Sequence, residues 1–223
     1  MLPAARELTP RELPFLYVTL GLCYIEIGAV ERALAPLDRG AQTGTGSVAW
    51  RSIGELSGLL SAYLRQDRDE LTRRIELLRN LPQAAFAPVD AMLVLPVCWV
   101  MIDLAAVDDA RRFADRRRAA VTQHGSPAYL AGLAVIDARL AAHEGQRAAA
   151  DGLLARAVQQ AQDAEHAPVL RRALELRVAL FGRPEDRAAL DRLHRQIAAS
   201  LPDDLRAIFL ASPRVRAVAA APS

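Results

Sequence analysis

The sequence predicts an all-α protein built from successive helix hairpins. Alanine and leucine, both strong helix formers, dominate the 223 residues, of which 52% are hydrophobic and only 5% aromatic. No segment alternates polar and apolar residues over the length of a strand, so we expect almost no sheet. Helix-breaking positions also recur at a near-constant interval. We therefore expect one elongated repeat domain spanning residues 1–223, with residues 1–8 and 217–223 flexible.

The first hairpin is predicted over Tyr17–Gly40. Gly28 breaks the first helix, and Gly21 is small where the second helix must cross closely, with Ala33 as the small residue opposite it. Four residues share one face of the first helix: Tyr17, Leu20, Gly21 and Tyr24. These positions predict two packed helices joined by a sharp turn.

Four further hairpins follow at similar spacing. The second covers Trp50–Leu81 and breaks at Gln66–Asp67, and the last joins Val169–Phe181 to Arg187–Ala199 through a Gly-Arg-Pro turn at 182–184. The third and fourth repeat the small-residue pattern of the first: Val97, Cys98, Met101, Ala110 and Ala114, then Ala138, Ala141, Gly145, Ala150 and Leu154. Equivalent positions 33, 71, 110, 150 and about 189 recur roughly every 38–40 residues.

The first hairpin resembles the tetratricopeptide repeat, whose pattern is W-x2-L-G-x2-Y…A-x3-F over 34 residues. The matching residues are Tyr17, Leu20, Gly21, Tyr24, Ala33 and Leu37. The resemblance implies a right-handed superhelix of about five such hairpins. Pro202 is predicted to start a capping helix that seals the last hairpin with Leu205, Ile208 and Phe209, because a solenoid needs a closed end.

The segment Leu201–Val215 is similar to the closing segment of helical-repeat tails on large bacterial signalling proteins. Those proteins join a kinase, cyclase or DNA-binding effector to a signal-transduction ATPase and end in degenerate helical repeats. The similarity implies that this chain is a regulatory repeat domain.

Charge and hydropathy argue against nucleic-acid and membrane partners. The net charge is only +2, and all 28 basic residues are arginine. The densest basic cluster (Arg111, Arg112 and Arg116–Arg118) is interpreted as a solvated helix face, with Phe113 on a different face. The longest uncharged run, Ala91–Ile102, is well short of the roughly 20 residues that span a bilayer.

The residues that could carry chemistry have structural explanations. Cys23 and Cys98 occupy core-like positions, which fits a reducing compartment, so we expect a cytoplasmic protein. The four histidines have no second ligand at metal spacing. The acidic pairs Asp108-Asp109 and Asp203-Asp204 open helices, where carboxylates favour the positive end of the helix dipole. We therefore expect no enzyme activity, no metal and no cofactor.

The first helices of the hairpins instead predict an apolar groove. In the tetratricopeptide geometry, twelve residues would line it: Phe15, Val18, Leu22, Ile25, Leu59, Tyr63, Met92, Leu95, Trp99, Ile102, Arg139 and His143. A patch of this kind is typical of an interaction site, and we expect it to bind a protein or peptide segment, from another protein or from the full-length chain itself. The chain lacks lysine, and its sole asparagine is Asn80, which argues against a carboxylate-clamp cochaperone.

Two other functions stay open. In a small-molecule sensor of a transcriptional or kinase regulator, Tyr63, Trp99, Arg139 and His143 would converge on a polar pocket. In a homo-oligomerisation module, a second copy would close the groove. For any single one of these residues, core packing is the alternative interpretation.

Overall fold

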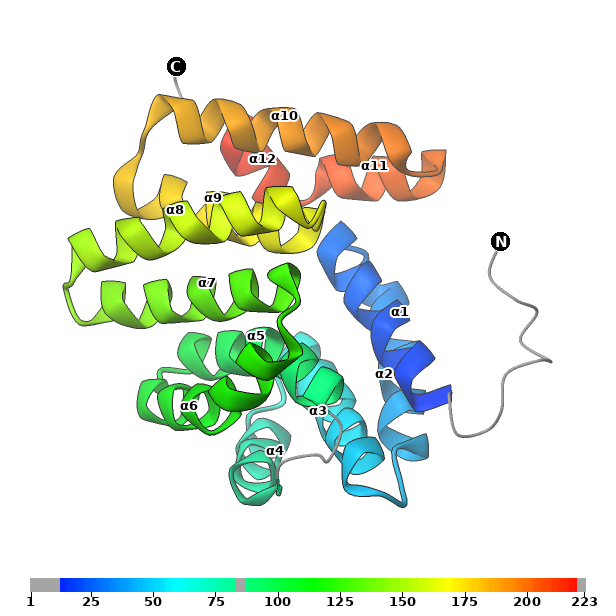
Figure 1. The fold of residues 1–223 in the computed structure, drawn as a ribbon. Helices are drawn as coiled ribbons and strands as arrows, with labels where there is room; N and C mark the ends of the chain where they lie inside the picture. The colour runs from blue at the N-terminus through cyan, green and yellow to red at the C-terminus, as the bar shows by residue number, and fades with distance from the viewer. Residues whose placement is uncertain (1–12, 83–86, 220–223) are drawn as a thin grey trace. The chain divides into compact units, whose positions relative to one another are not determined.

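The described part of the chain consists of helices and the turns between them (Figure 1). The structure is a computed structural model, and it describes residues 13–82 and 87–219. Within those residues there are twelve helices and no strand, and no helix there is both long and apolar enough to cross a membrane. The helices gather into two compact units, and the boundary between Asp109 and Ala110 lies in the first turn of the sixth helix.

Unit 1 is organised around its third helix. Its elements are α1 (Leu13–Ile27), α2 (Val30–Thr43), α3 (Val48–Arg65), α4 (Arg68–Asn80), α5 (Ala87–Asp103) and the first residues of α6 (Val107–His124). Helix α3 packs against α1, α2, α4 and α5. Its apolar residues Ile53, Leu56 and Leu59 have no exposed surface, so α3 forms the centre of the core of unit 1.

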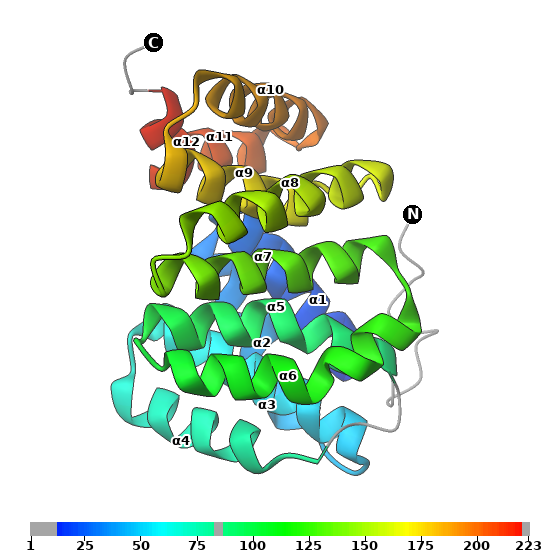
Figure 2. The same cartoon turned by 60° about the vertical axis from the view of Figure 1, so that its left-hand side comes forward.

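Unit 2 continues with the remainder of α6 and six more helices. These are α7 (Pro127–His143), α8 (Arg147–Asp163), α9 (Ala167–Phe181), α10 (Pro184–Ser200), α11 (Asp203–Ala211) and α12 (Pro213–Ala219). Figure 2 shows α7 to α10 as successive layers, in which α7 packs on α8 and α9, and α9 on α8 and α10. Leu174 of α9 and Leu190 and Leu193 of α10 form a buried cluster between these two helices.

The turn inside each hairpin has a residue in the left-handed region. These residues are Gly28, Gln66, Ala105, Gly145 and Gly182, separated by 38, 39, 40 and 37 residues. In the first four turns the next residue donates its N–H to the carbonyl oxygen five positions earlier, at 2.8–3.0 Å: Ala29 to Tyr24, Asp67 to Ala62, Ala106 to Met101 and Gln146 to Ala141. The predicted breaks at Gly28, Gln66, Gly145 and Gly182 are therefore confirmed, and the left-handed turns recur every 37–40 residues.

The close crossing of the two helices predicted at Gly21 is confirmed, and Leu37 supplies the nearest contact. A Cβ atom added to Gly21 would lie 2.4 Å from Cδ2 of Leu37. Leu37, which is fully buried, therefore fills the space above the glycine. Ala33 is itself fully buried.

The C-terminal cap is confirmed and extends further than predicted. Phe209 of α11 is fully buried, Leu205 and Ile208 are half-buried, and α11 packs on α10. A second short helix, α12, follows and continues to Ala219, so residues 217–219 are helical rather than flexible. Residues 1–8 and 220–223 lie outside the described residues.

The arginine cluster on α6 is not simply a solvated face. Arg117 is buried, and its guanidinium carbon lies 3.7 Å from the centre of the Phe113 ring. The two residues are four apart, which places them on the same side of the helix and corrects the prediction that Phe113 points elsewhere. Arg118 donates two hydrogen bonds of 2.9 Å to Asp137 on α7, so the cluster helps to hold unit 2 together.

His194 is a buried histidine of unit 2 whose pKa is strongly lowered. It is buried on α10, its ring meets Phe209 edge to face at 5.7 Å, and its Nε2 atom has no hydrogen-bond partner among the described residues. Burial first, and then the positive charge of Arg171 on α9, lower the pKa of His194 to about 4, against the opposing effect of Asp191. The folded protein therefore keeps this imidazole neutral at pH values where the unfolded chain protonates it.

We expect the free energy of unfolding to decrease as the pH falls from about 6.5 to about 4, because only the unfolded chain binds a proton at His194 in that interval. One such proton contributes at most about 1.4 kcal/mol per pH unit. Urea unfolding followed by circular dichroism at pH 6.5 and 4.5 measures the effect. The His194→Gln variant should lose this part of the pH dependence, and an unchanged dependence would contradict the assignment.

Candidate interaction site

Four predicted groove residues form a continuous stripe on α5. Met92, Leu95, Trp99 and Ile102 are spaced three, four and three residues apart, which places them on one helical face. All four are half-buried, whereas residues facing the other way are buried: Leu93, Val94, Val97 and Met101. From Ala91 to Ile102 the helix carries no charge. We call these four residues the α5 stripe.

Tyr63 adds an aromatic ring with a polar end close to the C-terminal end of the α5 stripe. It lies in the last turn of α3, and its hydroxyl donates a 2.5 Å hydrogen bond to Oδ2 of Asp103, the last residue of α5. Because α3 packs along α5, this bond fixes the tyrosine beside the helix end that carries Ile102. The half-buried Tyr63 therefore extends the stripe onto α3.

The predicted residues of α1 divide between core and surface. Phe15 is exposed, and Leu22 and Ile25 are half-buried. Val18 has no exposed surface because it shares a buried face with Pro14 and Gly21. Leu59 on the central helix α3 is likewise fully buried. The prediction that Val18 and Leu59 line a groove was wrong, since both side chains are committed to the core.

Arg139 and His143 lie four residues apart near the end of α7, in unit 2. Arg139 is half-buried and His143 is exposed. The predicted ligand pocket would need Arg139 and His143 together with Trp99 and Tyr63. The hydroxyl of Tyr63, however, donates its hydrogen bond to Asp103. The geometry within unit 1 favours the apolar part of the prediction, the α5 stripe with Tyr63.

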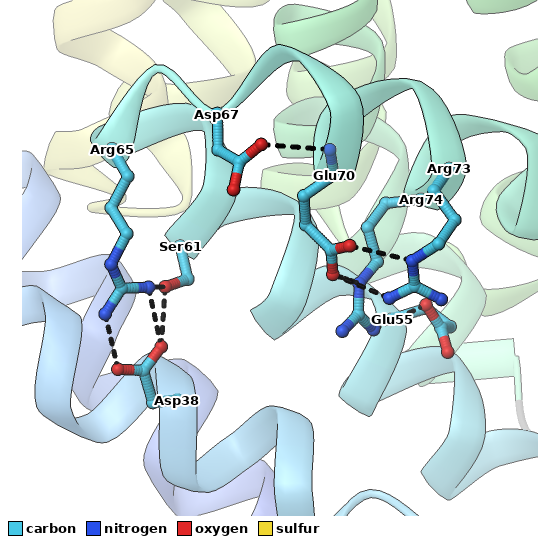
Figure 3. Close-up of polar contacts among 8 residues, drawn as sticks. All are labelled: Asp38, Glu55, Ser61, Arg65, Asp67, Glu70, Arg73 and Arg74. Atoms are coloured by element: carbon cyan, nitrogen blue, oxygen red, sulfur yellow. Dashed lines mark hydrogen bonds and ion pairs between the residues drawn. The ribbon is translucent and has the colours of Figure 1, made fainter.

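The charged residues of α2 to α4 join the helices of unit 1 to one another (Figure 3). Arg65 on α3 donates hydrogen bonds of 2.8 and 2.6 Å to the two carboxylate oxygens of Asp38 on α2, which also accepts one of 2.7 Å from Ser61. The bond from Arg65 is the main reason that the pKa of Asp38 is lowered. This contact links the second helix of one hairpin to the first helix of the next.

A second polar group closes the α3–α4 hairpin. Glu70 accepts hydrogen bonds from Arg73 and Arg74 on its own helix, and Arg74 also donates to Glu55 on α3 at 2.7 Å (Figure 3). The bonds from Arg73, and then those from Arg74, lower the pKa of Glu70 to about 2. Gly58 leaves the room that the Arg74 guanidinium occupies, since an added Cβ would lie 2.4 Å from its central carbon. These charges stabilise the hairpin.

The described residues contain no group of three or more histidine, cysteine, aspartate or glutamate side chains placed to hold a metal ion. The two cysteines differ: Cys98 is buried in α5 as expected, whereas Cys23 is exposed on α1, contrary to the prediction of a core position. Comparisons of the chain with protein-family models, with curated proteins and with solved structures find no match. The function is therefore inferred from the residues of this chain.

The structure reveals an apolar surface on α1 of which the groove prediction included only Phe15. On α1, Leu20 and Cys23 are exposed although neither was assigned to an interaction surface. The sequence does carry a signal for it: among the fifteen residues of α1 only Glu26 is charged. A helix that is apolar on all sides is normally covered on all sides.

Proposed function

We propose that this chain is a helical-repeat interaction module of the tetratricopeptide type, which binds an apolar segment of a partner protein. The α5 stripe is the observation that carries the proposal, because four apolar side chains at helical spacing remain half-exposed on a helix whose other faces are buried. Tyr63 borders the stripe with a polar end. Aromatic and methionine side chains in such a setting are typical of interaction surfaces.

The packing of helices supports the repeat type. The first helices of neighbouring hairpins contact each other, α1 with α3 and α3 with α5 in unit 1, and α7 with α9 in unit 2. The second helix of one hairpin also packs on the first helix of the next, as α2 does on α3 and α8 on α9. Repetition of these contacts, at the near-constant interval of the left-handed turns, would generate a right-handed superhelix of five hairpins.

In the regulatory role that the similarity of Leu201–Val215 implies, occupancy of the α5 stripe would be relayed to an effector domain of a bacterial cytoplasmic signalling protein. Insertion of a partner's apolar side chain beside Trp99 would remove both from water. A buried aromatic side chain contributes about 2 kcal/mol or more when it anchors an interface. Trp99 is the residue of the stripe with the largest apolar surface to bury.

Selection of a displayed library of random dodecapeptides against the purified chain tests this proposal. The chain has two tryptophans, Trp50 and Trp99, so Trp50→Phe leaves Trp99 as the only indole and its fluorescence reports peptides that bind at the stripe. We expect apolar peptides that shift this fluorescence. Trp99→Glu, tested in the chain that retains Trp50 and followed by anisotropy of labelled peptide, should weaken their binding at least about 30-fold.

Leu77→Glu is the matched control, because Leu77 is an exposed apolar residue on α4, a helix that carries no residue of the stripe. It should leave peptide affinity unchanged. Circular dichroism checks that both variants keep their helicity. Peptides that bind the parent chain and Trp99→Glu equally well would overturn the assignment of the stripe.

A further inference from the structure

Helix α1 has an apolar side that no described residue covers. Of its fifteen residues, only Pro14, Val18 and Gly21 are buried. Phe15 and Leu20 are 47% and 38% exposed. These exposures are large for a helix with a single charged residue, and they show that α1 presents apolar surface to solvent.

The exposed residues lie together. At 100° per residue, the buried face of α1 is centred near Gly21 and Val18, and the side away from it carries five uncharged residues, with Glu26 at the C-terminal end of the same side. We call these the α1 outer face: Phe15, Leu16, Thr19, Leu20 and Cys23. The Thr19 hydroxyl donates to the backbone carbonyl of Phe15 at 2.8 Å, so even this polar group is satisfied within the helix.

The equivalent face of α3 is buried. Alignment of the left-handed turn residues Gly28 and Gln66 places each α1 residue 38 positions before its counterpart in α3. The counterparts of the α1 outer face are all buried: Ile53, Gly54, Ser57, Gly58 and Ser61. Residues that are buried in the second hairpin are thus exposed or half-exposed in the first.

The preceding hairpin supplies much of this cover. Ser61 donates a hydrogen bond to Asp38 of α2, and a Cβ added to Gly40 of α2 would lie 2.6 Å from the hydroxyl of Ser57. Gly54 packs against Gly44, the residue just after α2. A Cβ atom added to either glycine would lie within 3.0 Å of backbone atoms of the other. Gly58, the counterpart of Leu20, instead lies against Arg74 of α4 in its own hairpin. Three of the five positions of the α1 outer face therefore correspond to residues by which one hairpin stacks on another.

We propose that the α1 outer face binds the same face of a second copy of this chain, in an antiparallel, two-fold symmetric dimer. A two-fold contact brings identical patches together, and the five residues of this patch carry no charge, so Glu26 at its C-terminal end is the one charge of α1 that the contact must keep apart from its copy. Its mixture of small (Thr19, Cys23) and large (Phe15, Leu16, Leu20) side chains lets the ridges of one helix enter the grooves of the other.

The position of Glu26 selects the antiparallel arrangement. Leu20 is the central residue of α1, and Glu26 lies six residues beyond it, near the C-terminal end. At about 1.5 Å per residue, antiparallel helices crossing at Leu20 hold the two carboxylates about 18 Å apart, beyond the screening length in physiological salt. A parallel arrangement would place the two carboxylates side by side. The dimer contact is distinct from the α5 stripe.

The full chain supplies its own reporter of this contact. Cys23 is exposed on the α1 outer face, whereas Cys98, the only other cysteine, is buried. Light scattering after size exclusion measures the mass across protein concentrations, and alkylation of Cys23 by N-ethylmaleimide measures how accessible the face is. We expect a dimer at high concentration and a rate of Cys23 alkylation that falls at least about tenfold as the dimer forms.

A matched pair of variants locates the interface. Leu20 and Leu77 are 38% and 39% exposed, on α1 and α4 respectively, so Leu20→Glu and Leu77→Glu make the same change at equal exposure. Leu20→Glu buries a carboxylate in the dimer and should raise the dissociation constant at least about 30-fold. Leu77→Glu should leave it unchanged, and circular dichroism checks the helicity of both.

Three results would overturn the proposal. The first is a chain that stays monomeric with rapid Cys23 alkylation at every concentration, because the face would then be open. The second is a monomer with slow, concentration-independent alkylation, because another segment of the same chain would then cover it. The third is a dimer that Leu20→Glu does not weaken. A dimer that persists in Trp99→Glu supports the proposal and separates it from peptide binding at the α5 stripe.

Discussion

Replacement of Phe209 by alanine is expected to destabilise unit 2 by about 3–5 kcal/mol, the usual loss for a fully buried phenylalanine. Phe209 is the buried residue of α11 and has no exposed surface. Its ring meets the His194 ring edge to face, and the Arg171 guanidinium lies 6.0 Å from its centre. The truncation would leave a cavity beside two polar groups that the ring now shields from water.

Urea unfolding followed by circular dichroism measures this change. Leu210→Ala is the control, because Leu210 is the next residue on α11 and is 47% exposed. We expect it to change the free energy of unfolding by no more than about 0.5 kcal/mol. If the two variants lost similar stability, α11 would not act as the cap of the last hairpin.

Gly54→Ala is expected to destabilise unit 1 by about 1–3 kcal/mol, although alanine is the better helix former. A Cβ at Gly54 would lie 2.9 Å from the carbonyl oxygen and 3.0 Å from the Cα of Gly44. Backbone atoms cannot move aside as the end of a side chain can. The substitution would therefore push α3 away from the end of α2, where the first two hairpins meet.

The same substitution at Gly152 should change the free energy of unfolding in the opposite direction. Gly152 lies within α8, and apart from its adjacent residues and the backbone of its own helix no atom lies within 4 Å of a Cβ added there. Gly152→Ala should stabilise the protein by about 0.5–1 kcal/mol through helix propensity alone. Both tryptophans lie in unit 1, so fluorescence follows Gly54→Ala, while circular dichroism follows both variants. Stabilisation by Gly54→Ala would show that α2 and α3 do not approach as closely as described.

The hairpins could be predicted because their signals are local. A turn in the left-handed region favours glycine, so Gly28, Gly145 and Gly182 mark three of the five hairpin breaks directly. At Gln66 the signal is the break between two amphipathic patterns. Ala105 carries no such signal, because alanine gives no indication that its backbone adopts a positive φ at a cost of about 1 kcal/mol.

The candidate site was predictable only in part. The α5 stripe follows from helical spacing, since four apolar residues that share a face stay together however the helix packs. Which face is buried is a property of neighbours distant in sequence. Val18 and Leu59 have the same apolar character as the stripe, yet packing places both in the core. Cys23, placed in the core from its apolar surroundings, is exposed.

The sequence by itself determined the all-helical class, the order and approximate bounds of the hairpins, and the presence of a C-terminal cap, because helix propensity, periodicity and turn chemistry act over a few residues. Only the tertiary structure decided which residues face water. Burial depends on contacts between helices that lie tens of residues apart, such as α1 with α3 and α3 with α5. The exposed side of α1 and the half-exposed side of α5 emerge only from that packing.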